Sequence, residues 1–78
     1  MEKSVELNLL RNRLAEFEIP HYLALQEAKE MTLLLDEGVA EKKEVYRQGA
    51  EAALAKASEF ELIIGLVREQ ISDLEASD

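Results

Sequence analysis

The sequence predicts an all-α protein, an antiparallel hairpin of two long helices. Ala, Leu and Glu dominate its 78 residues, which include only three glycines and one proline, and this composition favours helix. In both halves of the chain, apolar residues recur at alternating spacings of three and four, the heptad pattern of helices that pack against each other. No stretch alternates apolar and polar residues for long enough to predict a strand.

The first helix is predicted over residues 3–36. Its two series of core positions are Leu7, Leu14, His21, Ala28 and Leu35, and Leu10, Phe17, Ala24 and Met31. Pro20 removes one backbone donor, which costs about 3 kcal/mol in a helix interior. However, the heptad passes Pro20 without losing phase, and Ile19 before it is a poor N-cap. We therefore expect one continuous helix, kinked at Pro20.

A turn is predicted at Asp36–Gly38. Gly38 is the expected left-handed residue that ends the first helix, since glycine has no Cβ to clash in that conformation. With Glu41 three residues later, Gly38 is also a candidate cap for the second helix. A connection this short makes the two helices antiparallel neighbours.

The second helix is predicted over residues 39–75, so that one hairpin domain occupies residues 1–78. Its core series are Lys43, Ala50, Ala57, Ile64 and Ile71, and Val39, Tyr46, Ala53, Phe60, Val67 and Leu74. Pairing Leu35 with Val39 across the turn brings every core position opposite another. The pairs include Met31 with Lys43, Ala28 with Tyr46, His21 with Ala53 and Phe17 with Ala57. In two of these pairs, Ala28 with Tyr46 and Phe17 with Ala57, a large aromatic side chain meets a small one, as interdigitated packing requires.

Several apolar residues lie outside this heptad seam. Clusters of exposed apolar residues at helical spacing usually mark a contact surface. The residues predicted to bind a partner are Val5, Leu9, Ile19, Tyr22, Leu23, Leu62, Ile63 and Leu66. Because a single two-helix seam is a small core, we expect the hairpin to complete a helical bundle, either as a homodimer or with a different protein.

The charge pattern argues against several classes of partner. The net charge is −8, with Glu and Lys or Arg interspersed along the chain, and such a balance opposes binding to nucleic acid or to anionic membranes. No apolar stretch is long enough to span a membrane, and the start MEKSVELNLL lacks the pattern of a signal peptide. The absence of cysteine suits a reducing compartment. We therefore expect a cytoplasmic protein.

The sequence offers few groups for chemistry. Its four serines have no arranged histidine or lysine, and its glycines are isolated. Glu18 and His21 have the spacing used by carboxylate-bridged di-iron bundles, but the further core glutamates that such a site needs are missing. We expect neither an enzyme nor a bound metal or other cofactor.

In size and predicted hairpin architecture, the chain resembles the small co-chaperones that hold needle subunits in type III secretion. It is less similar to the WXG-type secreted hairpins, since its turn contains no tryptophan. The resemblance implies a non-enzymatic adaptor or co-chaperone that binds partner helices. The alternative is a homodimeric four-helix bundle, a regulator or inhibitor from a phage or mobile element that acts on a protein target. A structural dimer without a recognition surface is a third hypothesis.

Overall fold

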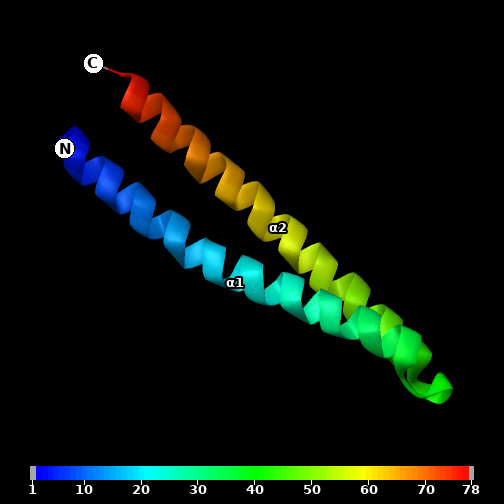
Figure 1. Ribbon diagram of the computed structural model, residues 1–78. Helices are drawn as coiled ribbons and strands as arrows, with labels where there is room; N and C mark the ends of the chain where they lie inside the picture. Colours follow the sequence, from blue (N-terminus) through cyan, green and yellow to red (C-terminus); the bar gives the residue numbers. More distant parts are fainter. Residues whose placement is uncertain (1, 78) are drawn as a thin grey trace.

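The computed structural model describes residues 2–77 and confirms an all-α hairpin (Figure 1). Helix α1 spans Lys3–Glu37, one turn of 3-10 helix follows at Ala40–Lys42, and helix α2 spans Lys43–Ala76. The hairpin extends over 59 × 14 × 14 Å. The helices run antiparallel, so the two ends of the chain lie at the same end of the molecule (Figure 1). No strand occurs within residues 2–77.

Helix α1 continues through Pro20 without a break. The continuity predicted from the unbroken heptad is therefore confirmed, while the kink stays a prediction. An interior proline leaves one carbonyl of the helix without its usual donor. Packing of the apolar seam on both sides of Pro20 is what keeps the two segments in one helix.

The connection between the helices begins later than predicted and has a different conformation. Helix α1 includes Glu37, and the connection occupies residues 38–42. Gly38 has φ −80° and ψ −179°, which is extended backbone, so the prediction of a left-handed residue was wrong. Its N–H donates a hydrogen bond of 2.7 Å to the carbonyl oxygen of Leu34. A Cβ at Gly38 would collide with that oxygen and come within 2.8 Å of Tyr46 Cε2. Glycine is therefore needed at this position because the backbone of Leu34 and the ring of Tyr46 approach it closely.

Nor does Gly38 cap the second helix. Val39 precedes the 3-10 turn and Lys42 precedes α2, and neither side chain makes a capping hydrogen bond. The chain therefore enters α2 through a 3-10 turn, in which backbone bonds such as Lys42 N–H to the Val39 carbonyl oxygen replace a side-chain cap.

The heptad seam forms the core. The buried apolar residues are Ala24, Ala28, Ala50, Ala53, Ala57, Ile64, Val67 and Ile71, and all of them are predicted core positions. The other core positions, including His21, are half-buried. Val39 and Lys43 are the exceptions, because both are exposed. They lie where the chain leaves one helix and enters the other, before α2 reaches the seam.

The register differs from the predicted one. Met31, predicted to face Lys43, instead has its Sδ atom 3.2 Å from where a Cβ on Gly49 would lie. Leu10 lines a hollow together with Gln70, six residues beyond Ile64, which the predicted register places opposite Leu10. The shift is roughly one heptad, because the connection uses residues that the prediction had assigned to the seam. A shift of about seven residues again brings core positions together, which explains why the heptad is preserved.

The size of the core residues changes along the hairpin. The buried alanines lie toward the turn, whereas the larger buried residues, Ile64, Val67 and Ile71, lie toward the chain ends. In the view of Figure 1 the helices overlap near the turn and are separated toward their free ends. Small side chains permit close approach of helix axes, and larger ones separate them.

Candidate protein-interaction surface

Two long faces flank the seam of the hairpin. In an antiparallel pair of helices, the residues on one side of the seam in α1 face those on the same side in α2, and each series repeats every seven residues. The first face, called the Pro20 face, consists of Glu6, Leu9, Arg13, Glu16, Pro20, Leu23 and Glu27 of α1 and Lys56, Glu59, Ile63, Leu66, Gln70 and Asp73 of α2. The second, called the His21 face, consists of Arg11, Glu18, Tyr22 and Leu25 of α1 and Glu44, Arg47, Glu51, Leu54, Glu61, Gly65, Arg68 and Glu75 of α2.

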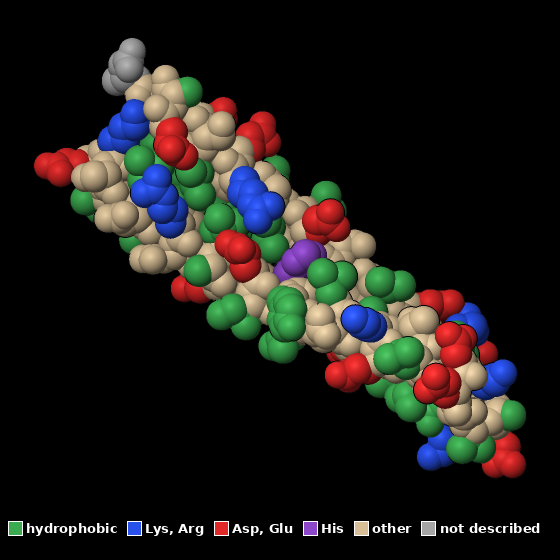
Figure 2. All heavy atoms as spheres, in the orientation of Figure 1, with side chains coloured by type: hydrophobic (Ala, Val, Ile, Leu, Met, Phe, Trp, Pro, Cys, Tyr) green, Lys and Arg blue, Asp and Glu red, His purple; other side chains and the backbone are tan. Residues whose placement is uncertain are grey.

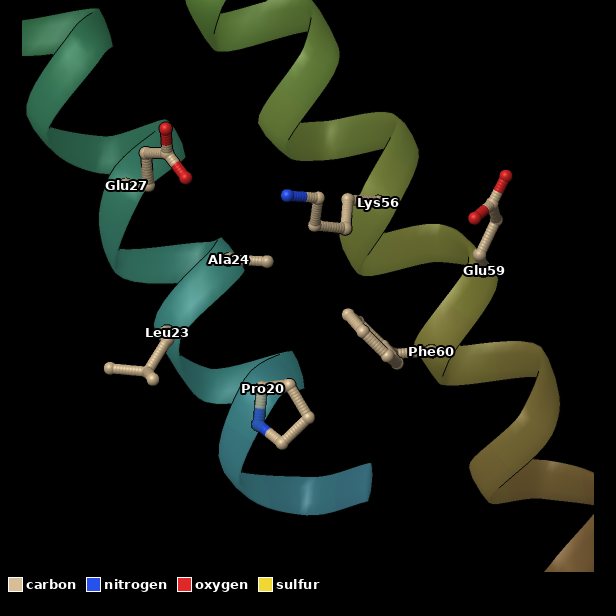
Figure 3. A pocket seen from close by; sticks show the side chains of 7 residues that line it. All are labelled: Pro20, Leu23, Ala24, Glu27, Lys56, Glu59 and Phe60. Atoms are coloured by element: carbon tan, nitrogen blue, oxygen red, sulfur yellow. The ribbon is translucent and has the colours of Figure 1, made fainter. Parts of the chain in front are cut away.

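The Pro20 face has a hollow between the two helices. Its volume is about 430 Å³, and its lining residues are Pro20, Leu23, Ala24, Glu27, Lys56, Glu59 and Phe60. The Phe60 ring points into the space between the helices, toward α1 (Figure 3). Leu23 points away from α2 and lies at the rim (Figure 3). The hollow therefore has an apolar floor and a rim that carries both apolar and charged side chains.

The same face is hollowed again toward the chain ends. Glu6, Leu9, Leu10 and Gln70 line a space of about 290 Å³, and a neighbouring space of about 410 Å³ reaches Leu74. Between these spaces and the Pro20 hollow, the Cζ atom of Arg13 lies 5.7 Å from the centroid of the Phe17 ring. The Pro20 face is thus a discontinuous groove along the open half of the hairpin.

Four of the residues predicted to bind a partner lie on the Pro20 face. Leu9, Leu23 and Leu66 are 53%, 59% and 61% exposed, and Ile63 is half-buried. The position of Ile63 beside the seam explains its partial burial. These four residues share one face, and their role in binding stays a prediction.

The other four predicted residues point elsewhere. Val5 and Ile19 lie on the back of α1, and Leu62 lies on the back of α2, where its side chain is 71% exposed. Tyr22 belongs to the His21 face. The structure therefore divides the predicted surface into one shared face and several outlying residues.

Sequence reasoning missed several residues of these surfaces. Pro20 and Phe60 line the larger hollow, and Val45 and Leu54 are exposed apolar residues of α2. Leu54 lies with Leu25 on the His21 face. Sorting the off-seam residues into series of seven would have separated the faces, because that spacing returns to the same side of a heptad helix.

The ion pairs lie on the His21 face. Arg47 pairs with Glu44 and, at 2.6 Å, with Glu51, while Arg11 lies 3.9 Å from Glu75. The hydrogen bond from Arg47 holds the pKa of Glu44 below its ordinary value. Side chains of both charges surround the single histidine on this side of the molecule (Figure 2).

Fewer carboxylates form ion pairs on the Pro20 face than on the His21 face, where Glu44, Glu51 and Glu75 are paired and Glu18 and Glu61 are not within residues 2–77. Within residues 2–77, none of the acidic residues on the Pro20 face forms an ion pair; they are Glu6, Glu16, Glu27, Glu59 and Asp73. The basic residues of this face are Arg13 and Lys56. The Pro20 face therefore carries an excess of carboxylates beside its exposed apolar residues.

His21 lies beside both charged and apolar residues, including Ile64. His21 lines a hollow of about 390 Å³ with Glu18, Glu61 and Arg68, so it does not face Ala53 as the predicted register required. Across residues 2–77, no three His, Cys, Asp or Glu side chains are grouped to hold a metal ion. Neither helix of this part of the chain is long and apolar enough to cross a membrane.

Comparison with known proteins finds no match to this hairpin. No protein-family model, curated protein or solved structure matches the chain. The similarity to type III secretion co-chaperones therefore rests on size and hairpin architecture.

Proposed function

We propose that this protein is a non-enzymatic adaptor or co-chaperone whose hairpin binds helices of a protein partner through its exposed apolar residues. The supporting observation is the imbalance between its core and its surface. Within residues 2–77, only three side chains larger than alanine are buried, whereas thirteen large apolar residues are exposed. Burial of apolar surface is favourable by about 25 cal/mol per Å². Covering these residues with further helices would enlarge a small core.

The shape of the surface favours a helix as the partner element. The exposed apolar residues recur along two long helices with no strand edge in residues 2–77 to pair with. An amphipathic helix that lies in an apolar groove presents residues at spacings of three, four and seven, which matches such a surface. Addition of one or two helices to the hairpin would give a three- or four-helix bundle.

A homodimeric regulator or inhibitor from a phage or mobile element is the second candidate. The same exposed residues support self-association, and the net charge of −8 suits binding to a basic surface on a target protein. The same charge opposes nucleic acid and anionic membranes as partners. A cytoplasmic location is part of both proposals, since the chain contains no cysteine and suits a reducing compartment.

A double variant of α2 tests the proposal. Leu62→Ser combined with Leu66→Ser should abolish association with the partner captured from host extract, while circular dichroism shows unchanged helix content. A thermal midpoint that rises with the concentration of the purified chain would identify self-association. The matched control is Leu25→Ser combined with Leu54→Ser, which removes two exposed leucines from the His21 face. Association that survives both double variants would contradict the proposed function.

A further inference from the structure

We propose that the Pro20 face binds a basic amphipathic helix of a partner protein, with its apolar stripe against the groove and Lys or Arg on both flanks. This inference rests on the proposed function and goes beyond it by naming the face and the chemistry of the partner. Apolar residues, hollows and carboxylates together carry it.

The apolar residues of the Pro20 face form an interrupted stripe. Leu9 and Gln70 line one hollow, while Leu23 and Glu59 line another. On α2, Ile63 and Leu66 lie between Glu59 and Gln70, so they fall between the two hollows. The stretch from Leu9 to Leu23 is about 21 Å long at 1.5 Å per residue, which accommodates about four turns of a bound helix.

The carboxylates of this face interrupt and border the stripe on both helices, since Glu16 lies in one row with Leu9 and Leu23. Glu16 and Glu27 lie on α1, and Glu59 lies on α2 at the rim of the larger hollow. Since no carboxylate of this face forms an ion pair within residues 2–77, each is available to a cation from a partner. Lys and Arg can lay their aliphatic stems along apolar surface while the charged ends reach carboxylates. Complementary charge of this kind gives specificity and rapid association.

A second copy of the chain fits the Pro20 face less well. Two copies that met through this face would bring the same excess of carboxylates together, and juxtaposed like charges oppose association. The His21 face is also a poorer site for a basic helix. Three of its five glutamates, Glu44, Glu51 and Glu75, already pair with arginines. The other two, Glu18 and Glu61, line its hollow together with Arg68, so a cation of the same sign as a basic helix already lies beside them.

Two synthetic peptides of about 18 residues test the inference against the full chain. Both carry the same leucine stripe and a fluorescent label, but one has lysine flanks and the other glutamate flanks. In fluorescence anisotropy at physiological ionic strength, the lysine peptide should bind at least about tenfold more tightly. The triple variant Glu16→Gln/Glu27→Gln/Glu59→Gln should weaken its binding by about tenfold. Leu23→Ser combined with Ile63→Ser should abolish binding, with circular dichroism as the check on folding.

Matched variants away from the Pro20 face distinguish binding of the peptide in the groove from its attraction by the net negative charge of the protein. Glu18→Gln/Glu61→Gln/Glu69→Gln removes three charges elsewhere and should change affinity less than about twofold. Leu25→Ser combined with Leu54→Ser should also leave binding intact. Equal losses in the two triple variants would show attraction by net charge alone and overturn the inference, as would the absence of peptide binding. A homodimer dissociated by the Pro20-face serines would overturn it in favour of a second copy.

The same experiment separates this inference from the proposed function. Equal binding of the lysine and glutamate peptides, lost in the Pro20-face serine variant, would reject the choice of a basic partner but retain helix binding. A different result would contradict the proposed function. In that case the partner would still be captured by both Leu62→Ser/Leu66→Ser and Leu25→Ser/Leu54→Ser.

Discussion

The ring of Tyr46 lies against Gly38 so closely that a Cβ on Gly38 would come within 2.8 Å of Tyr46 Cε2. The same Cβ would collide with the carbonyl oxygen of Leu34, in the last turn of α1. Because the backbone of Gly38 is extended, its conformation does not require glycine. The need comes from packing, since the Tyr46 ring and the end of α1 occupy the space beside it.

Gly38→Ala should therefore destabilise the hairpin. The added methyl group meets backbone that cannot move without disturbing the end of α1, and overpacking of this kind costs about 1–3 kcal/mol. Chemical unfolding followed by circular dichroism measures the loss as a lower denaturant midpoint.

The two other glycines are graded controls for that prediction. A Cβ at Gly65 meets nothing within 4 Å, so Gly65→Ala should stabilise α2 by up to about 1 kcal/mol through helix propensity. A Cβ at Gly49 lies 3.2 Å from Met31 Sδ, and a flexible methionine can yield, so Gly49→Ala should fall between the other two. Equal effects at all three glycines would exclude packing as the cause.

The seam could be predicted from sequence, but the register could not. Burial of Ala24 and Ile64 follows from their places in the heptad, because an amphipathic helix buries its apolar stripe. The register depends on how many residues the connection uses. A displacement by one heptad leaves every core position opposite another, so the apolar pattern does not distinguish the two alignments. The local packing of Gly38 decides between them, and it is visible only in three dimensions.

Engineered cysteine pairs test the register directly. The chain contains no cysteine, so each pair is free of competing thiols. Met31→Cys combined with Gly49→Cys should form an intramolecular disulfide on mild oxidation, because these positions are in contact across the seam. The control, Met31→Cys combined with Lys43→Cys, represents the register predicted from sequence and should stay reduced. Faster closure of the control pair, measured by gel mobility and free-thiol titration, would restore the predicted register.

The candidate surface could be predicted only in part. Exposure of Leu9, Leu23 and Leu66 follows from their positions outside the seam, but the hollows beside them depend on the observed register. Which charged side chains form ion pairs also could not be predicted from the sequence. Arg47 pairs with glutamates three and four residues away, whereas Lys56 forms no ion pair with Glu59 despite similar spacing within residues 2–77. Side-chain rotamers, rather than spacing, separate these cases.

Pro20→Ala should raise the stability of the hairpin. The substitution restores a backbone donor to α1 and removes the clash of the proline ring with the preceding turn, effects worth up to about 3 kcal/mol in a helix interior. Pro20 lines the hollow between the helices, so loss of its ring there offsets part of this gain in stability. Thermal unfolding monitored at 222 nm (the helix signal) provides the measurement.

Asn12→Ala is the control, because it introduces alanine into the same helix without removing a proline. Asn12 is exposed in the same helix, and this change alters helix propensity by less than about 1 kcal/mol. If Pro20→Ala raised the midpoint no more than Asn12→Ala, the proline would carry no net cost in α1.

Glu44→Gln should reduce stability at neutral pH but not in acid. The hydrogen bond and charge of Arg47 lower the pKa of Glu44 from its ordinary value of 4.5, so the folded state favours the ionised carboxylate. The contribution is therefore fully present above pH 4.5 and is lost as pH falls through the lower folded-state pKa. Because the group is solvent-exposed, we expect a decrease in Tm of less than about 5 °C at pH 7. Glu30→Gln is the matched control for removal of one negative charge, because the Glu30 carboxylate forms no ion pair within residues 2–77. A Glu44→Gln deficit that persists unchanged at pH 3 would rule out ionisation of Glu44 as its origin.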